Sequence, residues 1–255
     1  GENFGIGQLD GIRISFVITA AWWLAFSVPV LRDVHQTHYK PREEHLFKNT
    51  IAGLVGTCKK IFNDRRLMMF MLAFFFYIDA VNTVISMSTS YGTQLGIDST
   101  QLVVALLVTQ FVAFPCSIIY GKLAGRFGSK TMITAAVVAY MCIVFFAAFF
   151  LRAALEFWIL AILVGMFQGG IQALSRSYYG KIIPKDHANE YYGFYDIFGK
   201  TASIIGTFLV ATTTSLTGNA SIGVLSIAIL LAVALVFLLL QKDPTKGSTA
   251  AATVD

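Results

Sequence analysis

Residues 131–151 have the sequence TMITAAVVAYMCIVFFAAFFL, with Lys130 directly before them and Arg152 directly after them. No charged side chain occurs between these two cations. A bilayer core of about 30 Å needs about 20 apolar residues in an α-helix, which rises about 1.5 Å per residue. The segment therefore predicts a helix that crosses a membrane.

Six other segments have the same character, and together they set the fold class. The full set predicts membrane-spanning helices at 14–32, 67–91, 101–121, 131–151, 156–175, 192–215 and 222–241. A chain that is 56% hydrophobic and 13% charged also has too few polar residues to cover a water-soluble globule of this length. We therefore expect an all-α, polytopic membrane protein with seven transmembrane helices. Because the count is odd and the chain has no initiator methionine, we expect it to be part of a longer protein.

The basic residues are distributed unequally between the connections. Sixteen of the 19 lie in alternate connections or in the tail, namely Arg32, Lys40, Arg42, Lys48, Lys59, Lys60, Arg65, Arg66, Lys122, Arg126, Lys130, Arg176, Lys181, Lys185, Lys242 and Lys246. Only Arg13 and Arg152 lie on the other side, and Lys200 falls inside a span. Cytoplasmic loops carry such an excess. The pattern predicts that 32–66, 122–130, 176–191 and the C-terminus are cytoplasmic, so the net charge of +5 reflects topology and not a nucleic-acid patch.

Polar residues divide the predicted spans into two groups. The spans at 14–32, 131–151 and 222–241 carry only Ser, Thr and Cys, apart from the terminal Gln241. The other four carry stronger polar groups, which are Asp79 and Asn82, Gln110, Gln168 and Gln172, and Asp196 and Lys200. Intramembrane polar side chains normally face a bundle interior or an aqueous cavity. We therefore expect every third helix to be peripheral. A 3+3 arrangement of repeats in half of a transporter would produce this three-helix period.

Asp79 is the strongest single candidate for a functional group. It lies about 18 Å along its predicted helix, in one layer near the midplane with Gln110 and Gln168. A carboxylate at that depth costs about 2.5–3.5 kcal/mol on insertion scales, so it must be paired, hydrated or protonated. Asp79 can therefore either carry a coupling proton or lock its helix to a neighbour through fixed hydrogen bonds.

The other polar groups also leave two interpretations open. Asp196 and Lys200 are four residues apart and can pair along one helix face, or Lys200 can point into a cavity. Gln168 and Gln172 can bind a ligand or form hydrogen bonds between helices. The glycines of 165–170 predict close helix packing, and Pro115 predicts a kink.

The long connection at 33–66 differs from the others. Its apolar residues recur at helical spacing, which predicts an amphipathic helix at 43–62 on the cytoplasmic membrane surface or, alternatively, a soluble packing helix. His35, His38 and His45 lie in the same connection, but their spacing is not that of a set of metal ligands. We expect solvated histidines there, and neither a metal nor another cofactor.

Four sequence motifs resemble one superfamily of transporters. The string Gly121-Lys-Leu-Ala-Gly-Arg126-Phe-Gly128-Ser-Lys130 resembles the G-x-x-x-D-R-x-G-x-[KR] loop motif of the major facilitator superfamily, with Gly125 at the acidic position. Three longer strings are FYIDAVNT at 76–83, QGGIQALSRS at 168–177 and GFYDIFGK at 193–200. Together they resemble the branch that includes bacterial permeases of unassigned substrate and the fungal vacuolar amino-acid effluxers linked to autophagy. Gly206-Thr207 stands where that branch is expected to have Gly-Pro.

The resemblance covers the chain as the sixth to the twelfth helix of a twelve-helix transporter. It implies that 1–32 holds the last helix of an N-terminal half, 33–66 a cytoplasmic linker, 67–241 the C-terminal six-helix bundle and 242–255 a cytoplasmic tail. It also implies a secondary active transporter that works by alternating access, with proton-coupled efflux or exchange of a small polar, amino-acid-like solute. The expected partners are the missing N-terminal half, the solute, protons and the lipid bilayer of a bacterial cell membrane, without nucleic acid.

Site residues and competing functions follow from the same sequence. The expected substrate and proton pathway consists of Asp79, Asn82, Gln110, Gln168, Gln172, Asp196 and Lys200, and the expected gating motif of Gly121, Arg126, Gly128 and Lys130.

A non-transporting receptor or scaffold of transporter fold is one alternative function, and uptake of the solute in intact cells would distinguish a transporter from it. A membrane enzyme acting on lipids is another, but Asp186, His187 and Glu190 come without a placed Ser or Cys nucleophile. We therefore expect no enzyme.

Overall fold

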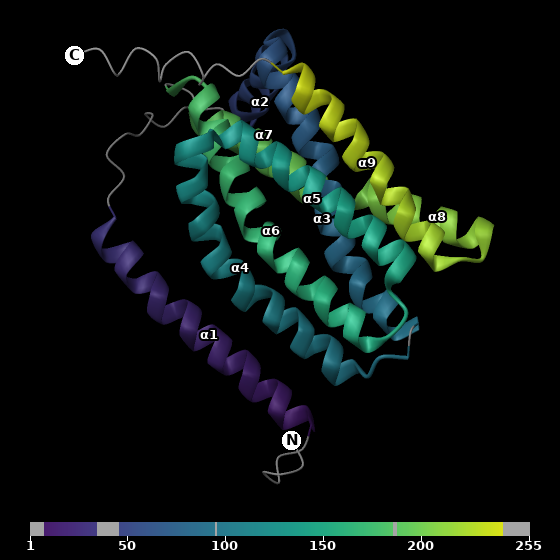
Figure 1. Cartoon of the computed structure of the whole chain (residues 1–255). Helices are drawn as coiled ribbons and strands as arrows, with labels where there is room; N and C mark the ends of the chain where they lie inside the picture. Colours follow the sequence, from purple (N-terminus) through teal and green to yellow (C-terminus); the bar gives the residue numbers. More distant parts are fainter. Residues whose placement is uncertain (1–7, 35–45, 95, 186–187, 242–255) are drawn as a thin grey trace. The chain divides into compact units, whose positions relative to one another are not determined.

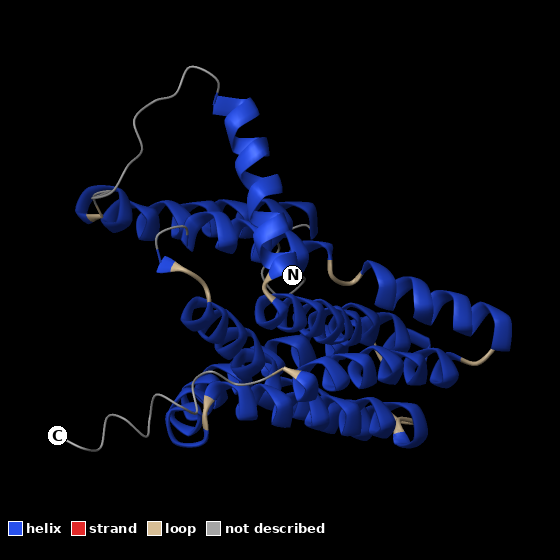
Figure 2. Ribbon diagram, turned by 90° about the horizontal axis from the view of Figure 1, so that it is seen from above, coloured by secondary structure: helices blue, strands red, loops and turns tan. Residues whose placement is uncertain are grey.

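The computed structural model describes residues 8–34, 46–94, 96–185 and 188–241. Every regular element in this part of the chain is a helix (Figures 1 and 2). The helices are α1 (Gln8–Asp33), α2 (Leu46–Asn63), α3 (Arg65–Gln94), α4 (Ser99–Phe127), α5 (Ser129–Phe150), α6 (Ala154–Ile182), α7 (Ala188–Thr201), α8 (Ile204–Thr217) and α9 (Ala220–Leu240). The chain divides into two units, 1–49 and 50–255, so α1 is described apart from the bundle formed by α3 to α9. The predicted tail at 242–255 lies outside the described residues.

Seven helical segments of the described chain are long and apolar enough to cross a membrane. They are α1 from Leu9, α3, α4, α5, α6, the pair α7–α8 taken together, and α9. This confirms the fold class that the apolar segments predicted. The amphipathic segment predicted at 43–62 does form a helix, α2, and the structure does not test whether it lies on a membrane surface.

Two predicted cytoplasmic loops are much shorter than expected. α4 continues to Phe127, so of the predicted loop 122–130 only Gly128 is not helical. Gly128 has φ +90°, which a residue with a side chain rarely adopts. α6 likewise continues to Ile182, well past its predicted end at 175. The prediction was wrong because it ended each helix at the first charge, whereas a helix can extend beyond the hydrocarbon core while its charged side chains reach water.

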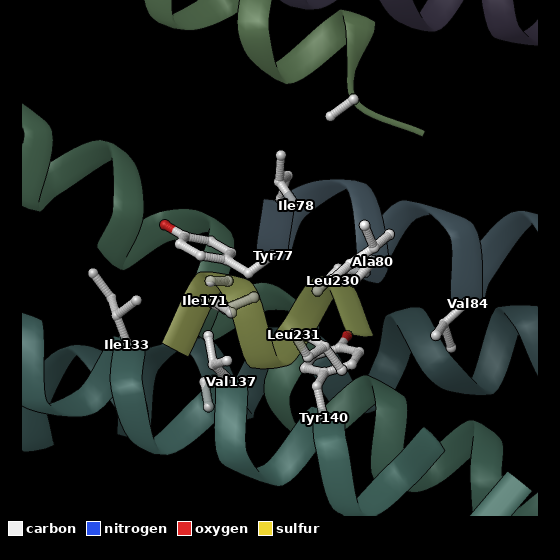
Figure 3. Packing of buried hydrophobic residues seen from close by; sticks show 14 of the residues in the cluster. Tyr77, Ile78, Ala80, Val84, Ile133, Val137, Tyr140, Ile171, Leu230 and Leu231 are labelled. Carbon is white, nitrogen blue, oxygen red and sulfur yellow. The ribbon is translucent and has the colours of Figure 1, made fainter. Parts of the chain in front are cut away.

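α3 lies at the centre of the bundle. It contacts each of α4 to α9, α4 packs along α6, and α9 packs against α3, α5 and α8. Side chains from α3, α5, α6 and α9 meet in this core, and Figure 3 shows among them Tyr77, Val137, Tyr140, Ile171 and Leu231. All five are fully buried.

Burial differs between the helices around α3. Of the most apolar 18 residues of each span, 61% are buried in α3, 44% in α9 and 39% in α5, but only 22% in α4 and in α7–α8. The sequence predicted α5 and α9 as peripheral, yet within this chain alone they are covered better than α4 and α7–α8. The open apolar surface of the bundle therefore lies mainly on α4 and α7–α8.

Candidate functional site

The span predicted as one helix at 192–215 is broken in two. α7 ends at Thr201, and α8 begins at Ile204. Ser203, the residue that precedes α8, has φ +103°, the one positive φ of a described residue other than glycine. Its side chain makes no capping hydrogen bond, so the first backbone N–H groups of α8 need another acceptor.

Asp79 of α3 supplies that acceptor. The Gly206 N–H donates to both carboxylate oxygens of Asp79, at 3.1 Å each, and the Thr83 hydroxyl donates to Asp79 Oδ1 at 3.4 Å. The Asp79 side chain is fully buried. A carboxylate at a helix N-terminus is stabilised by the aligned peptide dipoles and by the free N–H groups. Asp79 therefore caps a broken transmembrane helix from a neighbouring one.

Gly206 is the residue that makes this contact possible. A Cβ atom at this position would overlap Thr83 Oγ1 and would lie 2.9 Å from Asp79 Oδ1. In the sequence, Gly206 stood out only because Thr207 follows it where a proline is expected, and no role was predicted for it. Its partner is 127 positions away in the chain, so no local pattern indicates the contact.

No cation neutralises Asp79 among the residues that the structure describes. The ion pairs found there join Arg13 to Asp10, Arg32 to Asp33 and Arg176 to Asp196. The Asp79 carboxylate is thus stabilised by neutral N–H and O–H donors alone. Such a group can exchange a proton without breaking a salt bridge.

Gln110 and Gln168 line one narrow pocket between α3, α4 and α6. Its volume is about 30 Å³, and its polar lining is Ser88, Thr109, Gln110 and Gln168. Gln168 Oε1 is buried and has no hydrogen-bond partner in the described part of the chain. The pocket has room for about two waters, so on its own it is too small to enclose an amino-acid-sized molecule.

The remaining residues of the predicted pathway lie elsewhere. Asp79, Asn82 and Lys200 do not line this pocket. Gln172 and Lys200 are exposed on the bundle surface, and Asn82 is half-buried. The structure thus brings Gln110 and Gln168 together and places Asp79 at a separate contact with α8.

Of the two interpretations of Asp196 and Lys200, the pairing along one helix face does not form, and Lys200 is exposed. Asp196 forms an ion pair with Arg176 at 3.0 Å instead. The predicted span ended just before Arg176, but α6 continues to Ile182, so Arg176 lies within the helix. Its guanidinium lies beside α7. There it also lies 5.0 Å from the ring centroid of Tyr192. Both charged side chains are about half exposed, so the pair contributes little to stability.

An aromatic cluster that the sequence analysis missed holds α7 against α3 and α6. The Phe74 and Tyr195 rings stack with centroids 4.1 Å apart, and the Tyr179 hydroxyl donates to the Tyr191 carbonyl at 3.0 Å. The Tyr77 and Ser175 hydroxyls are 2.6 Å apart. The sequence signal for this cluster is the density of tyrosines in 178–195, most of which was expected to be a loop.

The residues of the predicted gating motif lie at the junction of α4 and α5. Lys130 donates to the Gln241 carbonyl, and Gln241 Nε2 donates to the Arg66 carbonyl at 3.3 Å. These bonds tie the start of α5 to the end of α9 and the start of α3. The guanidinium of Arg126 lies 5.6 Å from the ring centroid of its neighbour Phe127. Nothing lies within 4 Å of a Cβ built at Gly121 or Gly125, so an acidic side chain would fit at the position where the motif usually has one.

α2 is joined to α7 by a hydrogen bond from the Thr57 hydroxyl to Glu190 Oε2, at 2.9 Å. Glu190 was one of three residues considered for an enzyme; the other two, Asp186 and His187, lie outside the described residues. His35, His38 and His45 lie outside them too. Within the described part of the chain, no three His, Cys, Asp or Glu side chains gather as metal ligands.

Comparison with known proteins gives the class of this chain. Residues 4–252 match the family described as vacuole effluxer Atg22 like. The chain belongs to this family of major facilitator superfamily transporters, which is not a family of enzymes.

Individual relatives give the extent of the similarity. YxiO of Bacillus subtilis (strain 168), described as an uncharacterized MFS-type transporter, is 52% identical over 96% of this chain and 57% of its own length. Autophagy-related protein 22 of Cryptococcus neoformans (strain JEC21) is 24% identical over 89% of this chain and 43% of that protein. Autophagy-related protein 22 of Saccharomyces cerevisiae (strain S288c) is 25% identical over 84% and 47%. The chain thus spans about half the length of the curated relatives it matches.

Proposed function

We propose that this chain is the C-terminal half of a secondary active transporter that exports or exchanges a small polar, amino-acid-like solute and couples this movement to protons at Asp79. The contact between the buried Asp79 carboxylate and the Gly206 N–H supports the proposal most directly. Discontinuous transmembrane helices with half-helix N-termini are typical of transporter sites. Export is supported by the family description, vacuole effluxer, and the solute class by the resemblance to the fungal amino-acid effluxers.

Protonation of Asp79 would change how α8 is held. Hydrogen bonds to an ionised acceptor are about twice as strong as those to a neutral one, and a neutral acid no longer complements the positive end of α8. Gaining a proton would therefore loosen the start of α8 from α3. The chain has a place for the resulting motion, because α7 and α8 are already separated at Ala202 and Ser203.

The solute would bind at the polar wall that Gln110 and Gln168 form between α3, α4 and α6. Their amide groups can donate and accept hydrogen bonds, and the buried Gln168 Oε1 offers an acceptor to a donor such as a solute ammonium. The solute can drive the switch between the two access states only if it binds them unequally. We therefore assign the amide wall to solute binding and Asp79 to proton coupling.

The orientation that we propose places 33–66, 176–191 and the tail on the cytoplasmic side. Single cysteines introduced in place of Ser99 and Lys185 in a cysteine-free background should then react with impermeant reagents from opposite sides of the membrane. Labelling of both positions from outside the cell would reject the orientation.

Transport by the complete protein tests the proposal as a whole. Proteoliposomes with the complete protein and an imposed pH gradient should accumulate at least one member of a panel of ¹⁴C-labelled amino acids, in unchanged chemical form. Vesicles containing this chain alone should accumulate none, because half of the rocking unit is missing. Accumulation by the chain alone would contradict the two-half mechanism. The absence of any uptake by the complete protein would favour a receptor or scaffold, and chemical conversion of the solute would indicate an enzyme.

A further inference from the structure

A groove opens between the end of α5 and the start of α9, whereas Lys130 and Gln241 lie at the other ends of these two helices. Its volume is about 290 Å³, and its lining residues are Ala148, Phe149, Leu151, Arg152, Asn219, Ser221, Ile222 and Leu225. Arg152 follows α5 and Asn219 precedes α9, and together with Ser221 in the first turn of α9 they form the polar part. The other residues come from the last turn of α5, its C-cap Leu151 and the first turns of α9, and they form an apolar part.

Arg152 has no anionic partner among the residues that the structure describes. Among the described residues it takes part in no ion pair and no hydrogen bond, and no other Lys or Arg lies in the connections at this end. Two acids lie at the starts of α4 and α6, Asp98 and Glu156, and both serve as helix caps. Asp98 accepts from the Thr100 N–H at 2.8 Å, and Glu156 accepts from the Ala153 N–H at 3.0 Å. The hydrogen bonds from Thr100 hold the pKa of the Asp98 carboxyl below its usual value, so this carboxyl is ionised at neutral pH and already accepts the bonds of its helix cap.

The apolar part of the groove continues along the membrane-spanning surface. Phe149 is exposed, and its ring stacks on that of Phe145 one turn deeper in α5, with centroids 6.4 Å apart. Ile222 and Ile229 are exposed on α9 two turns apart. A ligand that fits this surface has an anionic group at the level of Arg152 and a hydrocarbon chain that runs from there toward the bilayer centre.

We propose that this groove binds one anionic phospholipid, with its phosphate on the Arg152 guanidinium and one acyl chain between α5 and α9. Guanidinium groups bind phosphate through two parallel hydrogen bonds, which gives Arg an advantage over other cations at such sites. Arg152 comes two residues after the end of an apolar helix, which is the depth of the lipid headgroups. A phosphatidylglycerol headgroup suits a single unpaired cation better than phosphatidylcholine, whose own choline cation would be repelled by Arg152.

Photocrosslinking tests this site in the complete protein. Nanodiscs would contain phosphatidylcholine and a small fraction of phosphatidylglycerol with a diazirine near the start of one acyl chain. Crosslinks should map to peptides covering 145–152 and 219–229. Arg152→Gln should lower the yield in these peptides at least fivefold, and so should Leu225→Trp, which fills the apolar part without touching the charge.

Arg65→Gln is the matched control, because Arg65 is also an exposed cation at a helix end but lies at the opposite end of the bundle. It should leave the crosslinks at 145–152 and 219–229 unchanged. Inorganic phosphate at millimolar concentration should not displace the lipid, since phosphate lacks the acyl chain. Equal labelling by a phosphatidylcholine probe, or labelling that Arg152→Gln does not change, would show only annular lipid and would overturn the proposal. Displacement by free phosphate would overturn the role of the acyl groove.

Discussion

Replacing Asp79 by asparagine in the complete protein is expected to abolish accumulation of the solute under a pH gradient, while downhill exchange of the solute continues. Asparagine keeps the shape of the side chain and an acceptor oxygen for the Gly206 N–H, but it cannot gain or lose a proton. The α3–α8 contact would then no longer respond to protons. Counterflow and pH-driven uptake in proteoliposomes, measured on the same preparation, separate the two activities.

Asp98→Asn provides a matched control for this experiment. Asp98 also caps a helix N-terminus with its carboxylate, but it is exposed outside the span. Asn and Asp are nearly equivalent at such a position, so both uptake and exchange should remain at the wild-type level. If Asp79→Asn retained full pH-driven uptake, the carboxylate would be structural and the coupling site would lie elsewhere.

Replacing Gly165 by valine is expected to destabilise the bundle by about 1–3 kcal/mol, the usual cost of overpacking a close contact. A Cβ at Gly165 would lie 2.7 Å from the Thr109 carbonyl oxygen and 3.1 Å from Val112 Cβ. The nearest atom belongs to the backbone, so α4 itself must move. Lipids do not drive helices together as water does, and close approach at small residues provides much of the attraction between them. Unfolding in mixed detergent micelles, followed by circular dichroism, measures the loss.

Gly125→Val is the corresponding control on α4. No atom lies within 4 Å of a Cβ built at Gly125, and the residue is exposed. The same substitution should therefore change stability by no more than a few tenths of a kcal/mol, since Val and Gly differ only slightly in helix propensity. Equal stability losses for the two variants would contradict the close packing of α4 and α6.

The membrane spans could be predicted because they depend on local composition. Segments such as 131–151 specify a helix through length and apolarity alone, and Gly165 and Gly169 indicated close packing through their spacing. The break at Ala202 and Ser203 could not be predicted, because neither residue is a glycine or a proline. It accompanies a contact with Asp79, far away in the sequence, which replaces the backbone acceptor that a continuous helix would have provided.

In the candidate site too, local features could be predicted, whereas contacts between distant residues could not. The energetic cost of a charge in the bilayer marked Asp79 as a residue that needs partners, and helix depth placed Gln110 and Gln168 in one layer, where they do line one pocket. Neither argument gives the rotation of one helix relative to another. The contact of Gly206 with Asp79 therefore had no sequence signal. The spacing of Asp196 and Lys200 allowed a pair between them, whereas an extended α6 brings Arg176 within 3.0 Å of Asp196.

Hydrogen exchange at the Gly206 amide tests most directly whether Asp79 holds and releases the start of α8. This N–H has Asp79 as its acceptor, and a bond to an ionised acceptor is stronger by roughly 1 kcal/mol than one to a neutral acceptor. In the complete protein in nanodiscs, protection of this amide, corrected for intrinsic exchange, should fall roughly fivefold as Asp79 gains its proton. In Asp79→Asn the protection should be low and independent of pH. Protection that stays constant across the pH range in which the wild-type protein transports, or that is unchanged in Asp79→Asn, would contradict the account.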